Sequence, residues 1–203
     1  MTFTFGQLLR GVEEQLGQRH RYAHCVRVAR CADVLAQRHG ADAGKARLAG
    51  LLHDLARLYS PERLVSECEA RGWTITRAER EHPVLLHARL GAAIARDRFG
   101  VEDPQVLSAI EKHTTGGAHM SPLDCIVYLA DSLEPERGFS ERGALWDLAL
   151  KDLSAAMRGV LLAAMRHNVR KGRPTAPETL AAAISFGLSV SGGFPAEARA
   201  SAS

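Results

Sequence analysis

The chain has 203 residues, 46% of them apolar and only 5% aromatic, which is enough for one domain with a sizeable core. Its formal net charge of +3 is too small, and its Lys and Arg residues too scattered, to indicate a nucleic-acid partner. No apolar stretch approaches the roughly 18–20 residues that span a bilayer, and the first ten residues do not resemble a secretion signal, so we expect no membrane association.

Helical periodicity dominates the chain, and strand-like alternation is almost absent. Helices are predicted at about 5–16, 18–39, 42–58, 60–71, 83–99, 103–113, 121–133, 143–150, 153–171 and 177–188. Capping signals support several boundaries, because Gly40 follows the second helix, Asp42 precedes the third and Ser60-Pro61 opens the fourth. Segment 73–81 is predicted to be irregular, and 113–120 and 134–142 are predicted loops.

These patterns predict an all-α fold with three segments along the chain. The first is an N-terminal helix (1–17), the second a single helical domain (18–188), and the third a disordered tail (189–203) rich in Ser, Gly and Ala. The four cysteines form no Cys-x-x-Cys pair; they are Cys25, Cys31, Cys68 and Cys125. We expect reduced thiols packed in helices and therefore a cytoplasmic protein.

Five predicted helices carry an imidazole or a carboxylate on the apolar face. His24, for example, precedes Val28, Cys31 and Leu35 by four, seven and eleven residues, so it points into the core. The same reasoning turns five further side chains inward: His53, Asp54, His87, His113 and Asp131. A buried charge is costly unless it is paired, and bound cations are the simplest way to stabilise two carboxylates among four imidazoles.

The composition of this set indicates which ions it would take. Nitrogen and oxygen ligands without thiolate suit iron, manganese, cobalt or zinc, and six ligands favour two ions bridged by a carboxylate over one tetrahedral ion. A single inward histidine is more often an ordinary core residue, so the interpretation rests on the joint pattern. The remaining histidines are interpreted as helix-end, surface or loop residues: His20, His39, His82, His119 and His167.

At these positions the sequence resembles the HD superfamily of metal-dependent phosphohydrolases, whose signature is a His, a His-Asp pair and a distant Asp. It further resembles the YqeK-type HD proteins, which are bacterial symmetrical hydrolases of diadenosine tetraphosphate. The matching segments are Arg21-Tyr22-Ala23-His24, Ala49-Gly50-Leu51-Leu52-His53-Asp54, Leu85-Leu86-His87, Gly91-Ala92, His113-Thr114-Thr115-Gly116 and Ala130-Asp131-Ser132-Leu133-Glu134-Pro135. The last two segments are the most specific.

The resemblance implies a single-domain HD-type helical bundle with a buried site for two divalent ions, and the family is associated with iron. The first ion would be held by His24, His53, Asp54 and Asp131. The second would be held by Asp54, His87 and His113. The implied reaction is the hydrolysis of diadenosine tetraphosphate, a small nucleotide, into two ADP. The residues expected to take part in catalysis are Asp54, Arg57 and His113.

The predicted substrate contacts lie around this site. Basic candidates for phosphate clamps are Arg57, Lys112 and Arg137. A loop that could cradle further phosphates contains Thr114, Thr115 and Gly116. Glu134 is expected either to orient a neighbouring group or to contact a ribose. Arg57 departs from relatives, which usually have Lys there; it retains the charge but cannot donate a proton at neutral pH.

Three other interpretations stay open at the level of sequence. The same site could act on another nucleotide phosphoester, the chain could be a nucleotide-binding sensor without turnover, or it could be a helical interaction module without metal. The sequence also leaves the oligomeric state open, because the apolar faces after Arg142 either complete the core or form a homodimer contact.

Overall fold

Helices begin where a polar side chain can cap the first free amides. Thr4, Thr76 and Ser121 each form a capping box with the residue three positions later, and Ser60 caps a helix that opens on a proline. The computed structural model describes residues 4–191 and 194–195. In that part of the chain the helices are α1 (Phe5–Leu16), α2 (Arg19–Arg38), α3 (Ala43–Leu52), α4 (Pro61–Ala70), α5 (Arg77–Glu81), the 3₁₀ turn η1 (Pro83–Leu85), α6 (Leu86–Phe99), α7 (Pro104–Lys112), α8 (Pro122–Leu133), α9 (Arg142–Ala149), α10 (Leu153–Arg170) and α11 (Pro177–Ser185).

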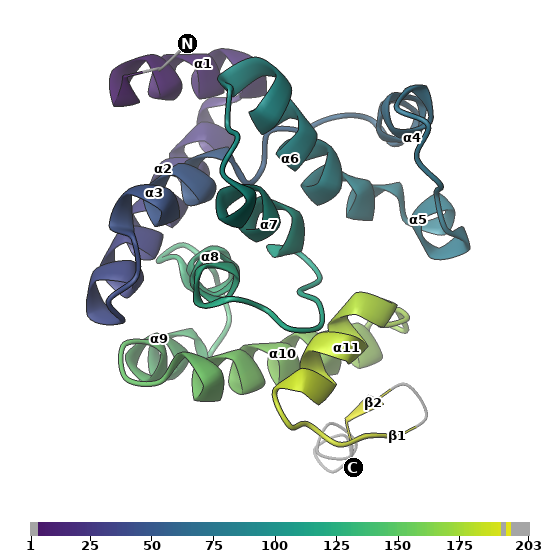
Figure 1. Ribbon diagram of the computed structural model, residues 1–203. Coiled ribbons are helices and arrows are strands. Elements are labelled where there is room, and N and C mark those ends of the chain that lie inside the picture. The colour runs from purple at the N-terminus through teal and green to yellow at the C-terminus, as the bar shows by residue number, and fades with distance from the viewer. Residues whose placement is uncertain (1–3, 192–193, 196–203) are drawn as a thin grey trace.

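Helix α8 lies in the middle of the bundle (Figure 1). It contacts α2, α3, α7, α9 and α10, and its residues 123–130 are all buried, as expected for a helix surrounded on every side. Helices α4 and α5 lie at the outer edge next to α6 and η1 (Figure 1). The core therefore gathers around α8 and the helices that carry the inward polar side chains.

Two glycines allow three backbones to approach closely near the centre. A Cβ at Gly50 of α3 would lie 2.9 Å from the Ala29 Cα of α2. A Cβ at Gly91 of α6 would lie 3.2 Å from the carbonyl oxygen of His53. The end of α3, and with it His53, is thus packed closely between α2 and α6, and a Cβ at either glycine would require its neighbours to move.

The all-α prediction is confirmed, whereas one helix boundary and one segment predicted to be irregular were wrong. The third helix was expected to reach Leu58, but α3 ends at Leu52 and residues 53–58 form successive turns with amide-to-carbonyl bonds spanning three residues, as from Arg57 to Asp54. The segment 73–81, expected to be irregular, contains α5. Its start could have been found from the Thr76-x-x-Glu79 capping box.

The end of the described chain has a short two-stranded pairing. Strand β1 (Val190–Ser191) pairs antiparallel with β2 (Phe194–Pro195), inside the segment that the sequence predicts to be disordered. Positions 192–193 and 196–203 of that segment lie outside the described residues. All four cysteines are free and buried, as predicted. None of the helices in the described ranges has the length and apolar character needed to cross a membrane.

Candidate metal centre

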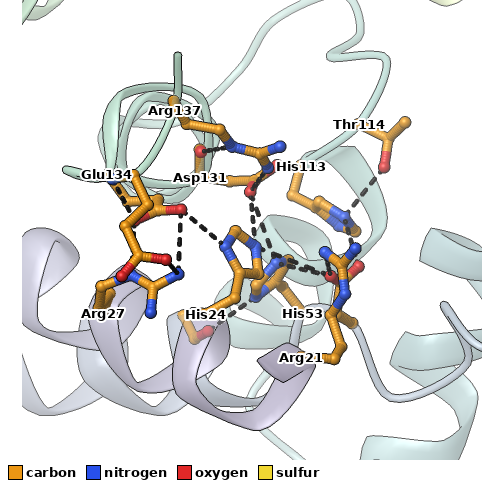
Figure 2. A network of polar contacts seen from close by, with 12 residues as sticks. Arg21, His24, Arg27, His53, His113, Thr114, Asp131, Glu134 and Arg137 are labelled. Atoms are coloured by element: carbon orange, nitrogen blue, oxygen red, sulfur yellow. Dashed lines mark hydrogen bonds and ion pairs between the residues drawn. The ribbon is translucent and has the colours of Figure 1, made fainter. Parts of the chain in front are cut away.

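The six inward side chains predicted from sequence meet at one place in the bundle. Four of them, His24, His53, His113 and Asp131, are labelled in Figure 2. The six come from α2, the end of α3, α6, the end of α7, and α8. Five of them are at most 3% exposed as residues, and the carboxylate of Asp131 is 15% exposed. Asp54 lies between two halves of the set, because its Oδ2 faces His53 Nε2 at 3.4 Å and its Oδ1 faces His87 Nε2 at 3.3 Å.

Three of the four imidazoles are oriented by backbone carbonyls three residues earlier. His53 Nδ1 donates to the Gly50 carbonyl at 2.8 Å, His113 Nδ1 donates to the Ile110 carbonyl at 2.7 Å, and His87 Nδ1 donates to the carbonyl of Val84. A carbonyl oxygen only accepts, so each of these Nδ1 atoms carries a proton. In the neutral ring, the Nε2 lone pair is then left free to bind a cation.

The fourth imidazole is oriented by a carboxylate. His24 Nδ1 donates to Glu134 Oε1 at 3.1 Å, and Glu134 Oε2 accepts from Arg27 Nε at 2.7 Å. Glu134 is 2% exposed, so this chain of hydrogen bonds is inside the protein. Carboxylate–histidine pairs of this kind orient metal-binding imidazoles and make them more basic.

The Nε2 atoms of the four imidazoles face the two carboxylates and one another inside the site. His24 Nε2 lies 3.0 Å from Asp131 Oδ1, and the Nε2 atoms of His24 and His53 are buried without a hydrogen-bond partner in the described structure. His87 Nε2 and His113 Nε2 lie 3.1 Å apart, and the single hydroxyl proton of Thr114 can serve only one of them. Converging lone pairs of this kind fit divalent cations in both halves of the set.

The carboxylates of the site are held in their anionic form. Burial by itself raises the pKa of the Asp54 carboxyl, but the charge of His53 and the contacts of His113 and His87 hold it well below its usual value. Burial likewise opposes ionisation of Asp131, but the adjacent His24 ring and the charges of His53 and Arg137 lower its pKa below the usual range. Both carboxylates therefore remain available to cations at neutral pH.

The surroundings of two buried imidazoles shift their pKa values in opposite directions. Burial lowers the pKa of His113, and the Asp54 carboxylate does not offset this effect. Burial also disfavours a charged His53, but the adjacent Asp54 carboxylate and the charge of Asp131 raise its pKa. Cys25 lies with His53 and Asp54 in a third compact group, yet burial raises the pKa of its thiol well above the usual value. A protonated thiol is a poor metal ligand, so Cys25 is not counted in the set.

The predicted substrate contacts lie in different surroundings. The Lys112 ammonium donates to the buried Asp124 at 3.0 Å, and Asp124 also accepts from the Ser121 amide, so Lys112 ties together the two ends of the 113–120 loop. Thr114 reaches the His87–His113 half of the site, whereas the Thr115 hydroxyl contacts only the carbonyl of Gly116 in the described structure.

The other predicted contacts lie at Arg57, Gly116, Glu134 and Arg137. Arg57 is half-buried in the turns after Asp54, and its guanidinium makes no hydrogen bond or ion pair with the described residues. Gly116 has φ +68°, a conformation that favours glycine, and Glu134 is engaged by His24 and Arg27 as described above. Arg137 Nε donates to the backbone carbonyl of Asp131 at 2.8 Å, and its Nη2 contacts the Asp131 carboxylate.

Sequence reasoning missed three polar residues of this region. Arg27 lies three residues after His24 on α2 and fixes Glu134, and Glu136 pairs with the same guanidinium at 2.7 Å. Arg21 donates to Asp54 Oδ2 at 2.9 Å, although the sequence marked it only as part of a segment that matches the family. The spacing of Arg21, His24 and Arg27 by threes, which places them on one helix face, was the available signal.

The chain is similar to known proteins over most of its length. The HD domain family matches residues 21–136. A protein of Bacillus subtilis named bis(5'-nucleosyl)-tetraphosphatase, symmetrical, is 35% identical over 168 residues, which cover 83% of this chain and 89% of the relative. A protein of the same name from Halalkalibacterium halodurans is 36% identical over 179 residues, covering 87% of this chain and 93% of the relative.

A solved structure agrees with the fold. The crystal structure of a predicted HD superfamily hydrolase involved in NAD metabolism, from Clostridium acetobutylicum, superimposes with a TM-score of 0.87 at 31% identity. The superposition covers 92% of this chain and 98% of the other.

Proposed function

Because this chain belongs to the HD domain family and matches symmetrical bis(5'-nucleosyl)-tetraphosphatases over more than four-fifths of its length, we propose that it hydrolyses diadenosine tetraphosphate into two ADP. The observation that carries the proposal is the position of Asp54. Its two oxygens face two separate pairs of imidazoles, an arrangement suited to two cations that share one carboxylate. Paired cations of this kind are used in the in-line displacement of phosphate groups.

The ligands divide naturally between the two halves of the set. His24, His53, Asp54 and Asp131 would hold the first ion, and Asp54, His87 and His113 the second. When bound, the ions supply an activated water and offset the charge that develops on the phosphate oxygens. We propose iron as the metal, since imidazole and carboxylate ligands suit it, with manganese, cobalt and zinc as the other ions that such ligands accept.

The chain's own residues position the reaction. Glu134 and Arg27 hold His24, and the backbone carbonyls of Gly50, Val84 and Ile110 hold the other imidazoles. The Thr114 hydroxyl, beside His87 and His113, is placed to donate to a phosphate oxygen at that half of the site, with the Thr115–Gly116 turn next to it. Attack at the second phosphorus from one end of the substrate's tetraphosphate consumes one water and releases two ADP.

The products test this proposal directly. Purified protein loaded with Fe²⁺ or Mn²⁺ is incubated with diadenosine tetraphosphate, and the nucleotides are separated by chromatography. Two ADP per substrate support the proposal, whereas ATP with AMP indicates an asymmetrical enzyme. Intact substrate after long incubation indicates a sensor, and turnover only of other phosphoesters in a parallel panel indicates a different HD hydrolase.

Arg57 gives a second test, of the substrate contacts. Its guanidinium is the one predicted phosphate clamp that makes no hydrogen bond or ion pair in the described structure, so we propose that it binds a phosphate of the substrate. Arg57→Ala is expected to raise KM for diadenosine tetraphosphate about tenfold while the bound metal stays unchanged. Loss of metal in this variant would instead make Arg57 a structural support of Asp54.

Location and assembly are also proposals. The four buried free thiols support a cytoplasmic location, where cysteines stay reduced. We propose that the side chain of Ile184 on α11, which is 61% exposed, contributes to a homodimer contact. Analytical ultracentrifugation of the protein and of Ile184→Glu tests the second proposal, since a dimer that uses this surface should dissociate in the variant.

A further inference from the structure

Two arginines bind the same carboxylate oxygens that the cations would use. Arg21 Nη1 lies 2.9 Å from Asp54 Oδ2, and Arg137 Nη2 contacts Asp131 Oδ1. Both oxygens also face the free imidazole nitrogens, because His53 Nε2 lies 3.4 Å from Asp54 Oδ2 and 3.7 Å from Asp131 Oδ1. The two guanidiniums come from α2 and from the segment after α8, and they meet the site beside the histidines (Figure 2).

These contacts are not ordinary surface ion pairs. The carboxylate of Asp54 is 4% exposed and that of Asp131 is 15% exposed, whereas the side chains of Arg21 and Arg137 are 20% and 39% exposed. The arginines therefore lie on the open side of the buried site. The Nε of Arg21 is itself buried and has no hydrogen-bond partner in the described part of the chain, which leaves one donor for an acceptor that the protein does not supply.

Charge balance gives the arginines a second partner. Without cations, the two guanidiniums neutralise the two carboxylates. Two divalent cations would add four positive charges, about as many as the negative charges on a tetraphosphate chain. A guanidinium beside a cation-bound carboxylate is repelled by the cation and attracted by a phosphate, to which its planar fork can donate twice.

We propose that Arg21 and Arg137 are exchangeable counter-ions, which neutralise Asp54 and Asp131 in the cation-free protein and bind substrate phosphates once cations occupy those oxygens. This inference rests on the proposed function and adds Arg21 to the residues that recognise the polyphosphate. It predicts that Arg21 opposes cation binding in the nucleotide-free protein and favours nucleotide binding in the cation-loaded protein. A residue that merely supported the structure would favour both.

The opposite signs make the test specific. Wild type and Arg21→Gln are stripped with chelator, and the dissociation constants for Mn²⁺ alone and for ADP at saturating Mn²⁺ are measured by calorimetry. We expect Arg21→Gln to bind Mn²⁺ about threefold or more tightly than wild type, and ADP about tenfold or more weakly. Arg137→Gln is expected to change both constants in the same directions, by smaller factors, since Arg137 is more exposed.

Controls separate this effect from a general loss of charge or fold. Arg71→Gln removes a guanidinium of similar exposure, 26%, which pairs with Glu67 of α4 at 2.9 Å. This variant should leave the dissociation constants for Mn²⁺ and for ADP unchanged. Arg21→Lys keeps the charge but not the fork, so it should retain wild-type Mn²⁺ affinity and still weaken ADP binding. If Arg21→Gln does not fold, Arg137→Gln provides the test, because both changes are expected in it too.

The outcomes divide cleanly. Weaker Mn²⁺ binding in Arg21→Gln, or wild-type values for both ligands, overturns the exchange. Because the experiment uses Mn²⁺ and ADP and no turnover, it can succeed even if the protein hydrolyses another nucleotide. Conversely, wild type can release two ADP from diadenosine tetraphosphate while the exchange fails, so the two proposals are judged separately.

Discussion

Replacement of Glu134 by glutamine should weaken the metal site without touching a predicted metal ligand. The Glu134 carboxylate accepts from His24 Nδ1, from Arg27 and from the amide of Glu136. Glutamine keeps one acceptor oxygen but loses the charge, so it cannot hold both His24 and Arg27 as before. Loss of such an orienting partner lowers metal affinity by about 10- to 100-fold, and we expect that range for the ion on the His24 side.

The same substitution should lower stability. Burial alone would raise the pKa of Glu134, but the hydrogen bond from Arg27, with those from the Glu136 amide and His24, lowers it from 4.5 to about 2. At about 1.36 kcal/mol per pKa unit, this lowering of the Glu134 pKa contributes roughly 3 kcal/mol to the free energy of unfolding at neutral pH. A carboxyl group whose pKa is lowered by folding stabilises the fold fully at any pH above its pKa in the unfolded chain, and this stabilisation is lost as the pH falls towards its pKa in the folded protein. The difference in free energy of unfolding between wild type and Glu134→Gln should therefore narrow as the pH falls from about 4.5 towards 2.

The assay is urea unfolding of the metal-free protein at several pH values, together with competition for Mn²⁺ by a chelator. Glu136→Gln is the matched control, because Glu136 also pairs with Arg27 at 2.7 Å but is 60% exposed. Glu136→Gln should lower the free energy of unfolding by less than about 1 kcal/mol and leave the Mn²⁺ affinity unchanged. If Glu134→Gln behaved like Glu136→Gln in both measurements, the carboxylate–histidine interpretation of this site would be refuted.

Two further substitutions test the packing and the loop. Gly50→Ala places a Cβ 2.9 Å from the Ala29 Cα and should cost about 1–3 kcal/mol in urea unfolding, whereas Gly6→Ala, with nothing within 4 Å, should be neutral or slightly stabilising. A Gly50→Ala protein as stable as wild type would show that α2 and α3 have room to separate. Thr114→Val removes the hydroxyl beside His87 and His113 and should lower kcat about tenfold, with Thr114→Ser close to wild type. Equal activity of the valine and serine variants would exclude a role for the hydroxyl.

Most helices could be predicted because their caps and apolar periodicities agree. The predicted end of α3 was misplaced because apolar periodicity does not show where a helix stops. Leu55 and Ala56 are buried, so the apolar pattern continues past His53 although the helix has ended. The Gly50 carbonyl, which would accept from the amide of residue 54 in a continuing helix, accepts from the His53 ring instead. That exchange depends on packing against α6, which the sequence alone does not reveal.

The convergence of the six side chains followed from helix faces, since a buried polar group needs a partner wherever it lies. The surrounding contacts did not follow in the same way. Arg27 and Glu134 are separated by 107 positions along the chain and meet only through the fold. Lys112 was predicted as a phosphate clamp from its charge, but charge alone does not show that its ammonium pairs with the buried Asp124. Side-chain partners outside one helix face therefore required the three-dimensional structure.

We propose that the Asp54 carboxylate joins two cation sites in the interior of the protein. Equilibrium dialysis of chelator-stripped protein against Mn²⁺, with the metal quantified per chain, tests it most directly. We expect two ions per chain for wild type, one for His87→Ala, and loss of tight binding at both sites for Asp54→Asn. Fewer than two ions in wild type, or two retained in Asp54→Asn, would contradict it.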